Sequence, residues 1–160
     1  MSVVEISLAR HREAPRLAAM SRRLVEAGLE PSWTTARVER HVAHEDSVVI
    51  VAKAAGEIAG FAIMQFGDLT AHLNLLAVEP RARRAGVGRA LVAWLEESAR
   101  VAGTFTVDLE LRADNVGAWR FYRALGYCET GRIRGYYQGV EDAIRMRREL
   151  AVVAPQLPAG

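Results

Sequence analysis

Two glycines beside a cluster of arginines are the residues whose types and spacing point most directly to chemistry. Gly86 and Gly88 lie between Arg84 and Arg89, and an apolar-striped segment follows at once. The first amides of a helix lack intrahelical acceptors and carry partial positive charge, so they attract phosphate. Glycine lets the backbone approach an anion without a Cβ in the way. The stretch favours a phosphate-binding turn at a helix start; the alternative is a tight turn with exposed arginines.

Two better-known phosphate loops do not fit this stretch. The dinucleotide-binding fingerprint requires a third glycine at the position of Leu91. The nucleoside-triphosphate loop requires Gly-Lys-Ser/Thr, whereas Arg89 follows Gly88 here. The arginines suit phosphate oxygens because the guanidinium fork matches them, although such a cluster can also be a solvated basic face.

A glutamate and a tyrosine further along also stand in informative patterns. Glu110 lies on the polar side of an alternating segment, opposite a row of apolar side chains, so it can face a cleft. Tyr122 follows Asn115 by seven residues, about two helical turns, so the two share a face. Each residue also has a structural alternative: Glu110 as a solvent-facing carboxylate, Tyr122 as a core aromatic and Asn115 as a helix cap.

Hydrophobic periodicity predicts the elements that position these residues. Helical spacing predicts helices over residues 11–28, 32–46, 87–102 and 114–126. Alternation and turn signals predict strands over residues 3–9, 71–80, 104–112, 127–136 and 141–150, and a hairpin over 47–68 that turns at "AAGE". The apolar row of the 104–112 strand includes Phe105. Strands and helices mix without strict βαβ alternation, which predicts an α+β or mixed-sheet fold.

Composition narrows the class of protein. The 160 residues suit a single domain, 1–150, followed by a flexible tail, 151–160. A formal net charge of only +2 argues against a nucleic-acid partner. The single cysteine, Cys128, excludes an internal disulfide and is expected to be a buried apolar residue; no Cys/His spacing suggests a metal site. We expect a cytoplasmic protein because neither a signal peptide nor a membrane span stands out.

Taken together, the motifs resemble those of the GNAT superfamily of acyl-CoA-dependent N-acyltransferases. That family carries Arg/Gln-x-x-Gly-x-Gly/Ala between a strand and a long helix, and Arg83-x-x-Gly86-x-Gly88 is similar to it. The stretch "LELRADNVGAWRFYRALGY" resembles the second family signature. The stretch "GYYQGVEDAIRMRREL" is similar to the ending of protein N-terminal acetyltransferases, including the bacterial ribosomal-protein-alanine type.

The resemblance covers roughly residues 58–150 and implies a fold and a co-substrate. The implied fold is a mixed, mostly antiparallel twisted sheet of about seven strands flanked by about four helices. The implied co-substrate is acetyl-CoA, bound without a metal. The residues expected to contact it are Leu76, Ala77 and Val78 along the pantetheine arm, Arg83, Arg84, Ala85, Gly86, Val87, Gly88, Arg89 and Ala90 at the pyrophosphate, and Asn115.

The resemblance also assigns chemistry. Glu110 is the implied general base, since an amine must lose a proton to attack a thioester. Tyr122 is the implied donor of a proton to the coenzyme A sulfur. His72 stands where many family members carry Glu; it either relays a proton beside the substrate or is a half-buried strand histidine. We favour the second reading, so removing His72 should leave turnover nearly intact.

Three aromatic residues are expected to line the acceptor site. Tyr136 and Tyr137, placed in the turn between the last two strands, resemble a tyrosine pair at the peptide path of N-terminal acetyltransferases. Trp33, in "EPSW", is the candidate for the opposite wall, although Ser32 separates it from Pro31 and so departs from the family's Pro-Trp.

The leading hypothesis is therefore an N-acetyltransferase that moves acetyl directly from acetyl-CoA to a primary amine in a ternary complex. A protein or peptide N-terminal amine is the first expectation for the acceptor. Alternatives are a small-molecule amine as acceptor and an acyl-CoA-binding module without turnover. We expect no membrane or nucleic-acid partner, and a monomer or homodimer.

Overall fold

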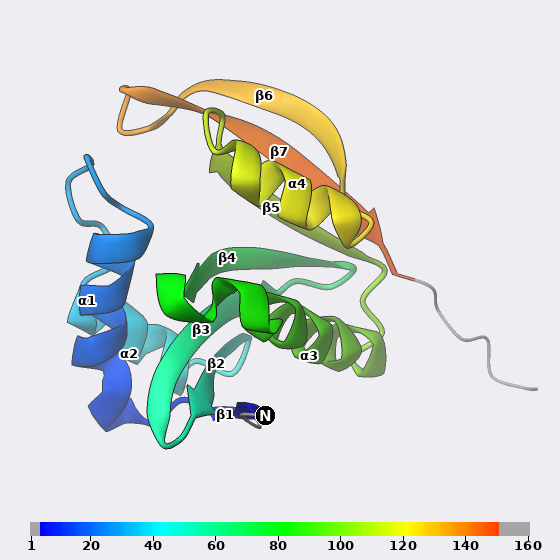
Figure 1. Ribbon diagram of the computed structural model, residues 1–160. Helices are drawn as coiled ribbons and strands as arrows, with labels where there is room; N and C mark the ends of the chain where they lie inside the picture. Colours follow the sequence, from blue (N-terminus) through cyan, green and yellow to red (C-terminus); the bar gives the residue numbers. More distant parts are fainter. Residues whose placement is uncertain (1–3, 151–160) are drawn as a thin grey trace, which may run out of the picture.

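The computed structural model describes residues 4–150 and contains one seven-stranded sheet (Figure 1). The strands are β1 Val4–Leu8, β2 Ser47–Ala54, β3 Glu57–Phe66, β4 Thr70–Val78, β5 Thr106–Arg112, β6 Cys128–Tyr137 and β7 Glu141–Glu149. Their order is β1-β2-β3-β4-β5-β7-β6, and every pair is antiparallel except β4 with β5. The mixed α+β fold expected from the sequence is confirmed.

Four α-helices and two short 3₁₀ helices accompany the sheet in the described residues. They are α1 Ala14–Leu24, α2 Thr35–Ala43, α3 Val87–Val101 and α4 Val116–Ala124, with η1 His11–Glu13 and η2 Pro80–Ala85. Buried residues of α3 and α4 join one hydrophobic cluster, whereas buried residues of α1 and α2 join another. The sheet therefore has a core on each face. None of these helices combines the length and apolar character needed to cross a membrane.

The helix bounds near the N-terminus differ from those expected. The first helix ends at Leu24 rather than near Gly28, and the second begins at Thr35, where the Thr34 hydroxyl accepts from the Arg37 amide at 3.2 Å. The segment between them is an irregular loop folded around Glu26. The Glu26 carboxylate accepts the amides of Ser32 and Trp33 at 2.8 and 3.0 Å, which replaces helical pairing there.

The predicted hairpin is confirmed, with a two-residue turn at Ala55 and Gly56. Both residues have positive φ, 52° and 80°, as the tight turn between twisted antiparallel strands requires.

The apolar row of β5 differs from the prediction at its first residue. Phe105 was expected on this buried row but is exposed, because β5 begins only at Thr106. Val107, Leu109 and Leu111 of that row are buried as predicted.

A register shift in β4 changes which side chains face which layer. Met64 pairs with Leu73 and Ile63 pairs with Leu75, so Asn74 is an extra residue in the strand. Leu73 accordingly belongs to the core on the α3 side, whereas Leu75 belongs to the core on the α1 side. Leu73 and Leu75 are two residues apart, so simple alternation would place both on the same face. The inserted residue between them moves Leu75 to the opposite face, which the sequence pattern alone cannot show.

The strands β4 and β5 diverge halfway along their length, and this positions the candidate site. Their parallel pairing runs only from Thr70–Thr106 to Leu73–Leu109. Beyond it, β4 continues to Val78 beside β3, and β5 continues to Arg112 beside β7. Figure 1 shows β5, α4, β6 and β7 leaning away from β4. We call this divergence the fork.

Candidate active site

Glu110 is the first residue of β5 beyond its pairing with β4. Leu109 is the last residue of β5 paired with β4, at Leu73, and Glu110 pairs only with Arg145 of β7. Its neighbours Leu109 and Leu111 point into the core on the α3 side, so Glu110 faces the opposite side of the sheet. The carboxylate thus lies at the fork, with a side chain only 7% exposed.

His72 and Arg145 hold Glu110 in this position, and Asn74 in turn holds His72. The His72 Nε2 atom lies 2.5 Å from Glu110 Oε2, and the His72 Nδ1 atom lies 2.9 Å from Asn74 Oδ1. The Arg145 guanidinium donates to the other carboxylate oxygen, with Nη2 at 3.1 Å. Sequence analysis missed Asn74 and Arg145, because each reaches the site through strand register.

The electrostatics of the fork keep Glu110 ionised. Burial acts to raise the pKa of Glu110, but the hydrogen bonds and charges of His72 and Arg145 outweigh it and lower the pKa below its ordinary value. The same contact acts on the imidazole in the opposite direction. The Glu110 hydrogen bond raises the pKa of His72 above its ordinary value, against the effect of burial.

Tyr122 lies on the other face of the sheet from Glu110. It belongs to the core on the α3 side, is 8% exposed, and packs edge-to-face against Phe121 and Tyr127. Burial raises the pKa of Tyr122, so its hydroxyl stays protonated at neutral pH. Within residues 4–150 this hydroxyl makes no hydrogen bond to another side chain or to the backbone, unlike that of Tyr127, which donates to Glu96 at 3.2 Å.

The glycine turn forms an uncapped helix start. Gly86 is the N-cap of α3, with φ 78° and no side-chain cap, and a Cβ placed there would meet no atom within 4 Å. Among residues 4–150, no side chain caps the first-turn amides of α3, and the Gly86 position before them borders open space. Gly88 is different, because a Cβ there would lie 3.1 Å from the Phe121 ring. A side chain at Gly88 would have to displace the Phe121 ring of α4 by a few tenths of an ångström.

Three arginines among the other predicted acetyl-CoA contacts flank this turn, whereas Asn115 lies at the start of α4. Arg83 Nε donates to the Val78 carbonyl at 3.2 Å, which ties the turn to the end of β4. Arg84 and Arg89 are exposed. Asn115 is the N-cap of α4 and accepts the Ala118 amide at 3.0 Å, so the capping alternative describes its contact here. Any role of Asn115 toward a ligand stays a prediction.

The two predicted acceptor tyrosines lie within reach of the Glu110 charge. Tyr136 and Tyr137 are the last residues of β6, not part of the turn, which consists of Gln138, Gly139 and Val140. Tyr136 is 44% exposed, and the charge of Glu110 contributes to raising the pKa of both tyrosines, after the larger effect of burial. They are therefore within electrostatic reach of the fork.

Trp33 is much less accessible than an acceptor wall would suggest. Its side chain is 7% exposed within the core on the α1 side, with the Arg37 guanidinium 3.8 Å from the ring centroid. Its burial follows from the Glu26 contacts that fold the loop inward. Contact of Trp33 with an acceptor stays a prediction.

Two further contacts tie this loop to the opposite half of the sheet. The Gln138 side chain donates to the Glu30 carbonyl at 2.6 Å and accepts the Glu30 amide at 2.9 Å. Arg112, paired with Glu141, donates to the Ala27 carbonyl at 2.7 Å. The loop between α1 and α2 thus meets the β6–β7 turn beside the tyrosine pair. Sequence carried no signal for this clasp.

One expectation about reactive residues was wrong. Cys128 is exposed at the start of β6, where its sulfur accepts from Arg123 Nη1 at 3.0 Å, rather than buried. β6 is an edge strand with largely exposed side chains, so its apolar residues need not face a core.

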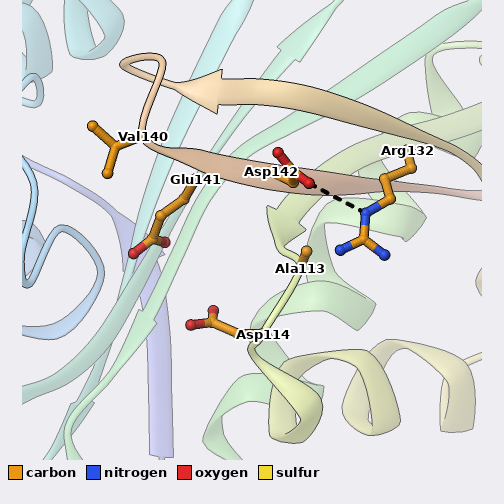
Figure 2. A pocket seen from close by; sticks show the side chains of 6 residues that line it. All are labelled: Ala113, Asp114, Arg132, Val140, Glu141 and Asp142. Atoms are coloured by element: carbon orange, nitrogen blue, oxygen red, sulfur yellow. Dashed lines mark ion pairs between the residues drawn. The ribbon is translucent and has the colours of Figure 1, made fainter.

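A cavity of about 330 Å³ lies beside the β6–β7 turn (Figure 2). It is lined by Ala113, Asp114, Arg132, Val140, Glu141 and Asp142. Figure 2 shows the Arg132–Asp142 ion pair at its rim, with a nitrogen–oxygen distance of 3.5 Å. Neither Glu110 nor Tyr122 lines this cavity, so we do not place the chemistry there.

Known proteins are similar to this chain in sequence and in fold. A [ribosomal protein bS18]-alanine N-acetyltransferase of Escherichia coli (strain K12) is 42% identical over 94 residues, which is 57% of this chain and 64% of that protein. The naa20 catalytic subunit of the N-terminal acetyltransferase B complex of Schizosaccharomyces pombe is 37% identical over 84 residues, 50% of this chain and 47% of that protein. The aligned part thus spans less than two thirds of these relatives.

The structural comparison extends over nearly the whole chain. The crystal structure of the ribosomal-protein-S18-alanine N-acetyltransferase from Escherichia coli superposes with a TM-score of 0.82 at 30% identity, covering 97% of this chain and 99% of that one. The family model described as Acetyltransferase (GNAT) family matches residues 16–127. With the fork, the glycine turn and the family match in agreement, the chain belongs to the GNAT acetyltransferase family.

Proposed function

We propose that this protein is an acetyl-CoA-dependent N-acetyltransferase whose acceptor is the N-terminal amine of a protein or peptide. The fork is the observation that carries the proposal. It leaves the β5-facing edge of β4 at Leu76, Ala77 and Val78 without a neighbouring strand, so an extended pantetheine arm can pair there. The uncapped start of α3 follows directly and suits a diphosphate.

The placement of Glu110 and Tyr122 supports direct transfer. Glu110 lies at the fork on one face of the sheet, and Tyr122 belongs to the core on the other face. A thioester held in the fork would then meet the amine on the Glu110 side and present its sulfur on the Tyr122 side. As the nitrogen–carbon bond forms and the carbon–sulfur bond breaks, the amine loses a proton toward Glu110 and the sulfur receives one from Tyr122.

Two observations favour a polypeptide end as the acceptor. The two relatives described above are named for acetylation of a ribosomal-protein alanine and for an N-terminal acetyltransferase complex. In this chain, the clasp between Gln138 and Glu30 bridges the region beside Tyr136 and Tyr137. If the acceptor reaches Glu110 past this bridge, a chain end can enter more easily than the middle of a polypeptide.

An acceptor screen tests the proposal. Peptides with varied first residues, their N-acetylated counterparts, and a panel of polyamines, amino acids and aminoglycosides are mixed with acetyl-CoA, and free thiol is measured. We expect release with a subset of free-amine peptides and none with the blocked ones. Turnover confined to small amines would refute the polypeptide acceptor. Coenzyme A binding without thiol release for any acceptor would favour the binding module instead.

A further inference from the structure

His72 connects the buried carboxylate of the fork to solvent. Its side chain is 37% exposed, whereas that of Glu110, 2.5 Å away, is only 7% exposed. Both ring nitrogens are engaged, since Nδ1 lies 2.9 Å from Asn74 Oδ1. The Asn74 side chain reaches this ring from the inserted position in β4. An isolated, half-buried strand histidine would have neither contact.

The two contacts determine where a proton binds. An amide oxygen is only an acceptor, so the His72 Nδ1 atom carries the hydrogen that Asn74 Oδ1 receives. In the neutral ring, Nε2 then presents a lone pair to Glu110, whose carboxylate is also an acceptor. Two acceptors facing each other gain a hydrogen bond when one proton is added between them. The pair is therefore built to take up one proton.

We propose that His72 and Glu110 act as one proton-accepting pair, with the proton resting on the imidazole and Asn74 fixing the tautomer. This inference rests on the acetyl transfer proposed above. As the nitrogen–carbon bond forms and the carbon–sulfur bond breaks, the amine nitrogen gives one proton to the pair and sulfur takes the Tyr122 proton. Afterwards the imidazolium releases its proton to water, and Tyr122 regains one from solvent.

The surrounding charges support a pair more basic than Glu110 alone. Glu110 by itself is a weak acceptor, because its pKa is lowered by His72 and Arg145 against the opposing effect of burial. The Glu110 hydrogen bond raises the pKa of His72, burial opposes it, and Asn74 and Asp108 add to the increase. The groups around the ring are Asn74 on β4, Asp108 and Glu110 on β5, and Arg145 and Arg147 of β7 behind those carboxylates. The transfer should therefore accelerate as pH rises through a value above the ordinary histidine pKa.

The kinetic test compares His72→Gln with Thr70→Val. Thr70 lies two residues away on the same face of β4, where its hydroxyl accepts from Thr106 at 3.0 Å, so its replacement controls for disturbance of this strand. Single-turnover rates are measured across pH with two acceptors of different amine pKa. Each pH–rate profile has rising or falling limbs that report the ionisation of a group. A limb whose pH midpoint is the same for both acceptors reports a group on the enzyme.

We expect His72→Gln to lower kcat by roughly 10- to 100-fold and to abolish that limb, while the Kd for coenzyme A stays unchanged. Thr70→Val should keep the wild-type limb. Added imidazole should restore part of the rate to His72→Ala, because the ring is exposed enough for a free imidazole to replace it. An unaltered limb in His72→Gln would overturn the proposal, as would a loss shared equally by Thr70→Val.

Nitrogen NMR of the imidazole tests the pair independently of turnover. We expect a neutral ring protonated on Nδ1, a raised pKa in the wild type, and a lower pKa in Glu110→Gln. Asn74→Ala should mix the two tautomers. A ring protonated on Nε2, or one whose titration ignores Glu110→Gln, would refute the pair even if acetyl transfer is observed. If no acceptor releases thiol, the proposed acetyl transfer is refuted. The NMR titration still tests whether His72 and Glu110 form a proton-accepting pair.

Discussion

Replacing Gly86 by glutamate or by glutamine separates charge from shape at the proposed diphosphate site. Gly86 has φ 78°, and a Cβ there meets nothing within 4 Å. Both variants carry the same strain, about 1–2 kcal/mol for a side chain in the left-handed region. Both also place a side chain of similar size before the first amides of α3. They differ in one negative charge.

That charge has opposite effects on folding and on binding. Near the start of α3, a carboxylate interacts favourably with the helix dipole, by about 0.3–1 kcal/mol. The ligand-free Gly86→Glu protein should therefore be as stable as Gly86→Gln or slightly more stable. Toward a diphosphate with two charges at ~5 Å, the same carboxylate costs ~1.7 kcal/mol in a water-like medium and ~6.6 kcal/mol at an effective dielectric of 20. Even the lower figure weakens binding roughly 15-fold.

Calorimetric titration with coenzyme A, beside thermal unfolding of the free proteins, measures both effects. The difference in Kd between the variants should shrink in 1 M salt, where the screening length is about 3 Å. Equal coenzyme A affinities for Gly86→Glu and Gly86→Gln would refute the diphosphate assignment. So would an affinity loss that follows the loss of stability instead of the added charge.

Other substitutions test the remaining parts of the site. Glu110→Gln should lower kcat by roughly 10²–10⁴-fold with unchanged coenzyme A binding, measured by single-turnover thiol release. Tyr122→Phe should lower kcat without lowering Tm, because the hydroxyl of this largely buried side chain has no hydrogen bond within residues 4–150. Glu96→Gln weakens the buried contact with Arg148, whose Nη1 lies 2.7 Å from Glu96 Oε2, and should lower Tm by roughly 3–10 °C in a thermal melt. Gln138→Ala removes both hydrogen bonds to the α1–α2 loop and should raise KM for a peptide acceptor more than it changes kcat.

The order and type of the elements followed from local pattern. The alternation around Glu110 placed it on a polar face because strand side chains alternate, and the cores confirm that assignment. The hairpin at Ala55 and Gly56 followed from its turn residues. The end of the first helix and the start of the second could not be predicted from local pattern. The Glu26 carboxylate binds the amides of Ser32 and Trp33, six and seven positions away, and these contacts compete with helical hydrogen bonds.

The contacts within the site depended on register between distant segments. Arg145 reaches Glu110 because β7 pairs with β5 antiparallel, and His72 reaches it because β4 pairs with β5 in parallel. One signal was available in retrospect: acids at alternate positions of β5, Asp108 and Glu110, match arginines at alternate positions of β7. Opposite charges directly across two strands stabilise the pairing.

The sequence by itself determined the mixed fold, the helix start at Gly86 and the face that carries Glu110, since each depends on local periodicity or backbone freedom. Only the tertiary structure decided that Asn74 is an inserted residue, that β4 and β5 separate after Leu73, and that His72 meets Glu110. The physical reason is that strand register and divergence are set by packing on both faces of the sheet, a balance among residues far apart in the chain.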